Sequence, residues 1–334
     1  METEAVESYR CPYTGEPLRL DGGKLVSAGG LEYPVIEGMP HLIQPDRESY
    51  TPEEAREKAY YETAARMYDE ALDWLFRSFY EDESAVRATM IDLLCVEPAH
   101  RVLETGAGTC RDTVLIAERL GSEGRLFAQD LSPEMLSIGR DRMRAAGLLA
   151  DSRAPVEFAV GNAARLPFAD GFFDSAYHFG GFNLFGDLRT ALAEMTRVVR
   201  AGGKVVVGDE GLAPWLRHTE YGSILMNSNP LYRHEAPLDS LPESARDAGV
   251  RWVIGSAFYV IDFEVGEGPP AVDLDLPILG RRGGTHRTRY YGRLEGVTPE
   301  ARRMAEEAAE ASGLSMHDWL ERTVRAAARR PPDR

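Results

Sequence analysis

A glycine-rich turn between a short apolar run and a helical pattern constrains this chain more than any other feature. The stretch from Arg101 to Thr113 reads RVLETGAGTCRDT. A strand that ends on an acidic residue, then Gly106-Ala107-Gly108, then a helix from about Asp112 to Leu120 is the order typical of a nucleotide-binding turn. A side chain at either glycine would block close approach of a ligand to the backbone. By itself the turn is equally compatible with an ordinary strand-to-helix connection.

Strand and helix patterns alternate after this turn. Apolar strand patterns that alternate with helical patterns of about ten or more residues predict a parallel sheet with helices on both faces. Ligands of such sheets bind at the carboxyl ends of the strands. We expect strands over residues 101–105, 125–129, 156–160, 173–179 and 203–208, and helices over residues 84–94, 112–120, 133–146 and 188–199.

Polar residues follow several of these strands directly. Asp130 closes the second strand in AQDLSPEML, where a carboxylate can accept hydrogen bonds from ribose hydroxyls. Asn162 follows the third strand in VGNAARLPF, and its amide offers both a donor and an acceptor to an adenine edge. His178 lies at the end of the fourth strand. These positions predict a nucleoside ligand at the carboxyl edge of the sheet.

Four motifs in this order resemble one enzyme family over residues 53–266: VLETGAGTCRDT, AQDLSPEML, GNAARLPFADGFFDSAY and EMTRVVRAGGKVVV. The chain resembles class I S-adenosylmethionine-dependent methyltransferases of the small-molecule type, similar to the enzymes of ubiquinone and menaquinone biosynthesis. The resemblance implies an α/β fold, with a Rossmann-like seven-stranded sheet whose last strand is antiparallel. It also implies an insertion at 210–248 that shapes the acceptor pocket, for which we expect helices around 216–226 and 240–247.

The resemblance implies S-adenosyl-L-methionine as the cofactor and assigns residues to its parts. The glycine turn would line the methionine portion with the acidic residue beneath it, the second strand end would hold the ribose, and the third would meet the adenine. The implied cofactor-binding residues are Glu104, Gly106, Ala107, Gly108, Asp130, Leu131, Asn162, Ala163 and Tyr68.

Two positions depart from the family pattern. Cys110 replaces the third glycine of the turn, and we expect it to fill space as a small buried side chain rather than to act as a catalytic thiol. Asn162 stands where aspartate is common, and asparagine is also an accepted variant. Neither departure argues against cofactor binding.

A helical pattern precedes the sheet. The run YYETAARMYDEALDWLF carries one apolar stripe at three and four residue spacing. It resembles the N-terminal helices that close over the cofactor in small-molecule methyltransferases, which makes Tyr60, Tyr61 and Tyr68 candidates to reach the ligand. The alternative is that the stripe only packs against the sheet.

Methyl transfer places modest chemical demands on the protein. The sulfonium methyl is already activated, so the main task is to hold the nucleophile in line with the C–S bond. A base is needed only if the acceptor arrives protonated, and histidine is the first residue type to inspect. We expect the catalytic candidates to be His178, Asp209 in the pair Asp209-Glu210 after the fifth strand, and His234 in the insertion. The alternatives are a hydrogen-bonded histidine in a strand-end loop and acidic residues that cap a helix or face solvent.

The acceptor itself is less constrained. The chain has HFGG where amino-methylating enzymes have Asn-Pro-Pro-Tyr, which disfavours adenine and glutamine amides as acceptors. An aromatic wall would suit a planar or apolar small molecule, although aromatic residues near a sheet edge also serve as core. The residues that could form it are Phe179, Phe182, Phe185, Trp215, Tyr221 and Tyr232.

Residues 1–48 predict a small β-module with strands over 24–27 and 31–36. The pattern resembles the zinc-ribbon-like module of the tRNA-methyltransferase activator fold, and an ordinary hairpin is the alternative. Thr14 occupies the position of the second cysteine, and Cys11 with the distant His41 cannot supply four zinc ligands. We therefore expect no metal in this module.

Residues 267–334 form a C-terminal extension. Helices are predicted over 299–312 and 315–328, with Thr298 and Ser315 as N-caps and Gly313 between them, and a strand over 285–294. The helical part resembles ribbon-helix-helix modules, which pair as dimers. We expect a homodimer contact or a lid rather than DNA binding.

Charge and composition limit the partners. The net charge of −16 would repel a phosphate backbone, so nucleic acid is a disfavoured substrate. No stretch of about 18 uncharged apolar residues predicts a membrane span. The N-terminus METEAVESYR lacks a secretion leader and the three cysteines are scattered, which favours a cytoplasmic protein.

These observations predict an enzyme that transfers a methyl group from S-adenosylmethionine to an oxygen, nitrogen or carbon of a small molecule by in-line displacement. Two alternatives stay open. An N-terminal zinc-ribbon-like module on this fold resembles ribosomal-RNA guanine methyltransferases. The second alternative is a non-catalytic regulator, which would bind S-adenosylmethionine and signal through the C-terminal extension.

Overall fold

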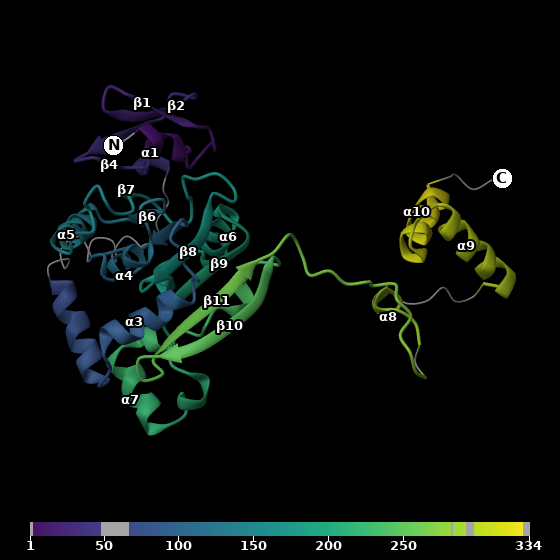
Figure 1. Ribbon diagram of the computed structural model, residues 1–334. Coiled ribbons are helices and arrows are strands. Elements are labelled where there is room, and N and C mark those ends of the chain that lie inside the picture. The colour runs from purple at the N-terminus through teal and green to yellow at the C-terminus, as the bar shows by residue number, and fades with distance from the viewer. Residues whose placement is uncertain (1–2, 48–66, 282, 292–296, 330–334) are drawn as a thin grey trace. The chain divides into compact units, whose positions relative to one another are not determined.

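The computed structural model describes residues 3–47, 67–281, 283–291 and 297–329. The chain divides into two compact units, Met1–Pro270 and Ala271–Arg334, which are described separately (Figure 1). Two of the tyrosines expected to reach the ligand, Tyr60 and Tyr61, lie outside the described residues. None of the helices in the described part of the chain is long and apolar enough to span a bilayer.

A seven-stranded sheet forms the centre of the first unit. Its strands lie in the order β10-β11-β9-β8-β5-β6-β7, and β11 runs antiparallel to both of its neighbours. The pairs β5–β6, β5–β8, β6–β7 and β8–β9 are parallel. The expected α/β sheet with an antiparallel last strand is confirmed. The strands are β5 Arg101–Thr105, β6 Arg125–Asp130, β7 Val156–Val160, β8 Phe173–Phe179, β9 Val199–Glu210, β10 Ala245–Val253 and β11 Phe258–Val265.

Helices cover both faces of this sheet (Figure 1). One buried cluster joins one face to α6 and to the N-terminal module, and a second joins the other face to α3, α4 and α5. Asp82, Ser132 and Asp187 cap α3, α5 and α6 by accepting hydrogen bonds from backbone amides, as short polar side chains do at helix starts. The helices are α3 Glu83–Asp92, α4 Arg111–Arg119, α5 Pro133–Ala145 and α6 Leu188–Val198.

The segment between β9 and β11 contains one sequence prediction that is wrong. Residues 240–247 are not a helix, because β10 already begins at Ala245. A register shift between Arg246 and Gly249 and a left-handed Asp247 at φ 48° mark a bulge, which interrupts the alternation and gives the sequence a helix-like spacing. The other expected helix is present. The elements before β10 are η3 Pro214–Leu216, α7 Glu220–Ser228, η4 Pro230–Arg233 and η5 Leu238–Ser240.

The N-terminal module is a four-stranded antiparallel sheet that packs against the large sheet. Tyr9 is fully buried, and its ring contacts the rings of Phe127 and Phe168 with centroids 6.1 and 5.4 Å apart. The Leu42 amide donates to the Val160 carbonyl of β7 at 2.7 Å. Module and sheet therefore share one core. Its elements are α1 Thr3–Ser8, β1 Leu18–Asp21, β2 Lys24–Ser27, β3 Glu32–Ile36, β4 Met39–Pro40 and η1 Pro45–Arg47.

The second unit consists of α8 His286–Tyr291, α9 Pro299–Ala311 and α10 Met316–Ala328. Thr298 and Ser315 cap α9 and α10 as expected. The strand expected over 285–294 is wrong for the described residues: the Thr288 amide donates to Thr285 Oγ1 at 3.1 Å, and this threonine turn starts α8 instead.

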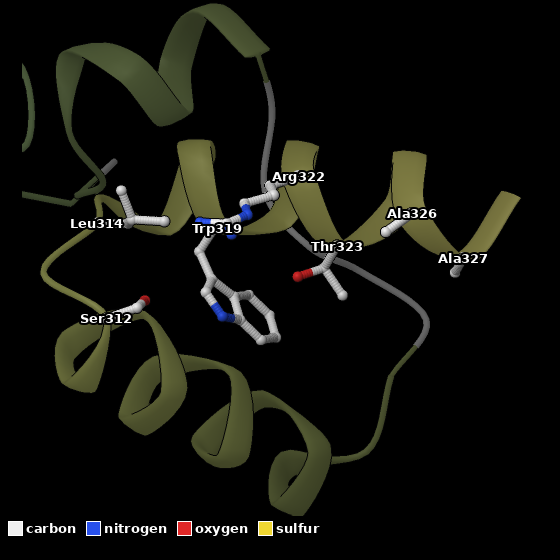
Figure 2. Close-up of a pocket in the computed structure, with 7 residues that line it drawn as sticks. All are labelled: Ser312, Leu314, Trp319, Arg322, Thr323, Ala326 and Ala327. Carbon is white, nitrogen blue, oxygen red and sulfur yellow. The ribbon is translucent and has the colours of Figure 1, made fainter. Parts of the chain in front are cut away.

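Trp319 points from α10 into a pocket of about 400 Å³ beside α9 (Figure 2). The pocket is lined by Ser312, Leu314, Trp319, Arg322, Thr323, Ala326 and Ala327.

Candidate functional site

Three residues of the turn after β5 have left-handed backbone conformations. Gly106, Gly108 and Cys110 have φ of 64°, 52° and 61°. A Cβ on Gly106 would lie 2.6 Å from Cε1 of His178, closer than real Cβ contacts come. Gly106 is therefore required both by its backbone angle and by its neighbour.

Glu104 lies buried at the end of β5, with only 3% of its surface exposed. Its Oε2 atom has no hydrogen-bond partner among the described residues. Burial, together with the negative charge of Asp112, raises the pKa of Glu104 well above its usual value. A buried carboxyl oxygen without a partner is a costly feature in a folded protein unless a ligand satisfies it.

Asp130 joins the end of β6 to the glycine turn. Its Oδ2 accepts from the Gly108 amide and its Oδ1 accepts from the Ser132 amide, both at 2.8 Å. Burial raises the pKa of Asp130, although these backbone hydrogen bonds oppose the shift. Each carboxylate oxygen has a second lone pair, so the group is still able to accept hydrogen bonds from two hydroxyls of a ribose.

The loop after β7 passes close to β6. A Cβ on Gly161 would lie 2.7 Å from the side-chain amide carbon of Gln129, so only glycine allows this approach. Asn162 Oδ1 accepts from the Ala164 amide at 2.9 Å, which fixes the loop, and Ala163 is buried. Asn162 and Ala163 therefore follow β7 at the same edge of the sheet as Asp130, as predicted from the sequence.

Residues 67–78 form a helix whose Tyr68 reaches these strand ends. The Tyr68 hydroxyl lies 3.9 Å from the position that a Cβ on Gly180, just after β8, would occupy. Burial raises the pKa of Tyr68, the charge of Arg87 opposes this shift, and the negative charges of Glu210 and Asp130 add to it. Tyr68 is therefore within electrostatic reach of the ends of β6 and β9.

An ion-pair network anchors this helix to the glycine turn. Asp69 accepts from Thr109 Oγ1 at 2.8 Å and from Arg111 Nε at 3.0 Å, and it also pairs with Arg142. Burial alone would raise the pKa of Asp69, but these hydrogen bonds and the charge of Arg142 hold it below its usual value. These contacts were not predicted from the sequence. The only available signal was Arg111 within the glycine motif.

His178 lies beneath the turn and is 1% exposed. Its Nδ1 and Thr105 Oγ1 are 3.0 Å apart, its Nε2 has no partner in the described part of the chain, and its ring contacts Phe182 and Phe185. Burial lowers the pKa of His178 against the opposing charge of Asp209, which favours a neutral imidazole. Its role in acceptor contact stays a prediction.

Asp209 and Glu210 end β9 with different surroundings. Asp209 is 1% exposed and accepts from the amides of Gly181 at 3.1 Å and Asn183 at 2.5 Å, so it anchors the turn that contains η2 Phe182–Leu184. Glu210 keeps some exposed surface. Burial, followed by the charge of Asp209, raises the pKa of Glu210 well above its usual value.

The remaining candidates are His234 and the aromatic residues of the expected wall. The His234 side chain is exposed, and its backbone carbonyl accepts a hydrogen bond from Arg217. The contacts of the aromatic residues are these: Phe182 and Phe185 pack on His178, Trp215 packs on Trp252, and the Tyr221 hydroxyl donates to Gly255. Phe179 and Tyr232 both contact Phe258. The aromatic wall stays a prediction.

Cys11 and Cys110 are buried and form no disulfide. A Cβ on Gly139 would lie 2.3 Å from Cys110 Sγ, so the thiol packs directly against α5. Burial raises the pKa of Cys110, which opposes thiolate formation. Cys11 lies 3.1 Å from the Tyr33 hydroxyl. In the described ranges, no three His, Cys, Asp or Glu side chains gather in a way that could hold a metal ion.

Comparisons with known proteins show which methyltransferases this chain resembles. Residues 51–211 match the ubiE/COQ5 methyltransferase family. A demethylmenaquinone methyltransferase of Bacillus cereus is 35% identical over 127 residues, which are 38% of this chain and 52% of that protein. A ubiquinone/menaquinone biosynthesis C-methyltransferase of Xanthomonas campestris is 38% identical over 124 residues, or 36% of this chain and 47% of that protein. The chain thus spans about half the length of these curated relatives.

Solved structures include phosphoethanolamine N-methyltransferase 2 of Haemonchus contortus with bound S-adenosyl-L-methionine. It has 12% identity and a TM-score of 0.47, and the match covers 63% of this chain and 60% of that one. The family match over residues 51–211 and the sheet order agree with the class I methyltransferase fold that the four motifs predicted. The zinc-ribbon likeness of the N-terminal module stays a prediction.

Proposed function

We propose that this protein transfers the methyl group of S-adenosylmethionine to a carbon of a small planar acceptor of the quinol class. The observation that carries the transfer is the meeting of Glu104, the Gly106 turn and Asp130 at one edge of the sheet. The acceptor class is supported by the relatives, which are named for demethylmenaquinone and for ubiquinone/menaquinone biosynthesis.

The residues at this edge fit the cofactor. The unpartnered oxygen of Glu104 would accept a hydrogen bond from the cofactor's ammonium group, and the glycine turn would admit its methionine chain. Asp130 would hold the ribose, while Leu131, Asn162 and Ala163 would contact the adenine. When bound, the cofactor supplies a methyl group that its sulfonium charge has already activated.

The chain's own contribution is to bind, orient and exclude water. Tyr68 on the helix 67–78 would cover the reacting groups, and the Asp69 network would hold that helix against the turn. Alignment of this kind accounts for about 7–11 kcal/mol of a barrier when two reactants are held in a near-attack geometry.

Two measurements on the full chain test the proposal. Isothermal titration should show one S-adenosylmethionine site per chain. Radiolabelled methyl should then pass to 2-geranyl-1,4-naphthoquinol, a short-chain demethylated quinol kept reduced by dithionite. A protein that does not bind the cofactor contradicts the methyltransferase proposal. Binding without transfer to any quinol contradicts the acceptor class. It would favour the alternative of a non-catalytic regulator that binds S-adenosylmethionine.

The proposal extends to a cytoplasmic location and to a homodimer through the C-terminal unit. Support for the dimer comes from α10, which has no buried residue in its described length, and from Met304 and Val324, which are 62% and 59% exposed. Sedimentation of the full chain should show a dimer, and Val324→Glu should give a monomer. A monomeric parent protein contradicts this part of the proposal alone.

A further inference from the structure

The first part of the connection between β7 and β8, residues 161–167, is the segment assigned to the adenine and is called the adenine loop below. It begins beside the expected ribose site, because the Gly161 amide donates to the Asp130 carbonyl at 3.0 Å. Asn162 and Ala163 come next in the chain. The geometry of this loop therefore decides how its side chains meet the base of a nucleoside.

The N-terminal module forms a hydrogen bond at each end of the adenine loop. The Leu42 amide donates to the carbonyl of Val160, the residue directly before the loop, at 2.7 Å. The Arg10 amide donates to the carbonyl of Pro167, the last residue of the loop, at 2.8 Å. Because both donors belong to one folded module, they fix the two ends of the loop relative to each other.

Tyr13 joins the two sides of this contact. The Arg165 guanidinium of the loop lies over the Tyr13 ring, 5.6 Å from its centroid, where the ring attracts a cation. The Tyr13 hydroxyl accepts from the Gln44 amide at 3.0 Å, two residues after Leu42. One side chain of the module thus connects the segment that holds β7 with a residue inside the adenine loop.

Helix α6 holds the last part of the loop from another direction. The Leu166 amide donates to Glu194 Oε2 at 2.8 Å, and Arg197 donates to the Leu166 carbonyl at 3.0 Å. The two residues assigned to the adenine lie earlier, between Val160 and Arg165. Their part of the chain is therefore the part that the module contacts on both sides.

Resting on the proposed function, we propose that the N-terminal module holds the adenine loop in its binding geometry, and that Tyr13 is a positioning residue for the adenine. Tyr13 acts through Arg165, and the module itself needs no contact with the cofactor. The Asn162 amide distinguishes one base edge from another only at hydrogen-bonding distance and angle. A loop that is fixed before the ligand arrives loses less conformational freedom on binding, which raises affinity.

The test measures how strongly the full chain prefers adenine. Titration calorimetry gives the Kd for S-adenosylhomocysteine and for S-inosylhomocysteine, in which a carbonyl oxygen replaces the adenine amino group. In Tyr13→Ala, the Kd for S-adenosylhomocysteine should rise about three-fold or more, because the contacts with Arg165 and Gln44 are lost. The Kd for S-inosylhomocysteine should change less than about two-fold. A merely structural loss would raise both Kd values by the same factor and leave their ratio unchanged.

Two variants serve as controls. Tyr13→Phe keeps the ring beneath Arg165 and removes only the hydroxyl, so it should retain most of the preference for adenine. Lys24→Gln removes an exposed ion pair with Glu32 in the same module and should bind both ligands as the parent protein does.

A second measurement uses the parent protein and does not depend on the folding of a variant. Coupling between two sites is reciprocal, so bound S-adenosylhomocysteine should slow amide hydrogen exchange at Arg10 and Leu42, as measured by NMR. S-inosylhomocysteine at equal occupancy should slow it less. The Gly30 amide, which donates to the Ser27 carbonyl at 3.0 Å within the module, should exchange equally in all three samples.

An unchanged ratio of the two Kd values in Tyr13→Ala overturns the inference. Equal exchange at Arg10 and Leu42 with and without S-adenosylhomocysteine also overturns it. A parent protein that binds neither ligand contradicts the proposed function and the inference with it, whereas one that binds both ligands equally contradicts the assignment of Asn162 to the adenine.

Discussion

At Gly106, two independent constraints act on one residue. The left-handed backbone strains any other side chain, and a Cβ would also collide with the His178 ring. Gly147 shares the first constraint, at φ 69°, but has nothing within 4 Å of its Cβ position. A comparison of these two glycines separates strain from collision.

We predict that Gly106→Ala destabilises the fold by about 1–3 kcal/mol more than Gly147→Ala, because overpacking adds to strain. Gly106→Ala should also weaken S-adenosylmethionine binding by at least about ten-fold, while Gly147→Ala leaves it unchanged. Urea unfolding and titration calorimetry measure the two effects. Equal stability and equal binding in the two variants would show that the His178 contact does not shape the turn.

Asp130 is the residue proposed to bind the ribose of the cofactor. Asp130→Ala removes the ribose acceptor and frees the Gly108 amide. Because hydrogen bonds to a charged group contribute about 1.5–3 kcal/mol, the Kd for the cofactor should rise roughly 10–100-fold. Asp151→Ala, in an exposed turn, is the control and should bind normally. A Kd that Asp130→Ala does not alter would remove the ribose assignment.

The positions of Asp130 and Asn162 at the ends of strands were predictable from the sequence, because they depend only on where each strand ends. The contacts of Asp69 with the glycine turn were not predictable from the sequence. The Asp69 contacts join segments 42 and 73 residues apart, and one sequence contains no record of such pairings. Burial, which sets the pKa of Glu210, is likewise a property of the packed structure.

Ion pairs and hydrogen bonds hold the helix over 67–78 against the glycine turn. Asp69 is its main anchor, and its lowered pKa means that the folded state favours the ionised form. The stabilisation is therefore present above the unfolded-state pKa of about 4 and is lost as pH falls through the lower folded-state value.

We predict that Asp69→Asn increases amide hydrogen exchange over 67–78 at neutral pH, and that the parent protein shows the same increase only when strongly acidified. The control is Asp73→Asn on the same helix, since Asp73 is 61% exposed and makes one bond to Arg111. Exchange that is equal in the parent and Asp69→Asn proteins would mean that packing alone holds the helix.

Regular alternation was enough to predict most strands and helices, including β7 and β8 at their observed bounds. The two wrong predictions, a helix over 240–247 and a strand over 285–294, arose where a local backbone feature departs from the regular spacing of apolar residues. The bulge at Asp247 interrupts the strand alternation within β10, and the threonine turn at Thr285 starts a helix within a β-branched, aromatic stretch.

At the scale of the molecule, the N-terminal module and the large sheet share one core through Tyr9. We predict that Tyr9→Ala costs about 3–5 kcal/mol, as loss of a buried aromatic ring does, and that module and sheet still unfold in one transition. Tyr80→Ala, at a residue 98% exposed, should have almost no effect. Two separate transitions on calorimetry would show that the module is independent.

The hydrogen bond from Leu42 to Val160 also has a consequence for solubility. β7 is the outermost strand of the seven-stranded sheet on that side, and an uncovered edge strand offers open amides and carbonyls to any passing strand. The module occupies the end of that edge. We expect that removal of the module exposes the edge of β7 and causes the protein to self-associate through it. Aggregation should increase with protein concentration, even if cofactor binding is retained.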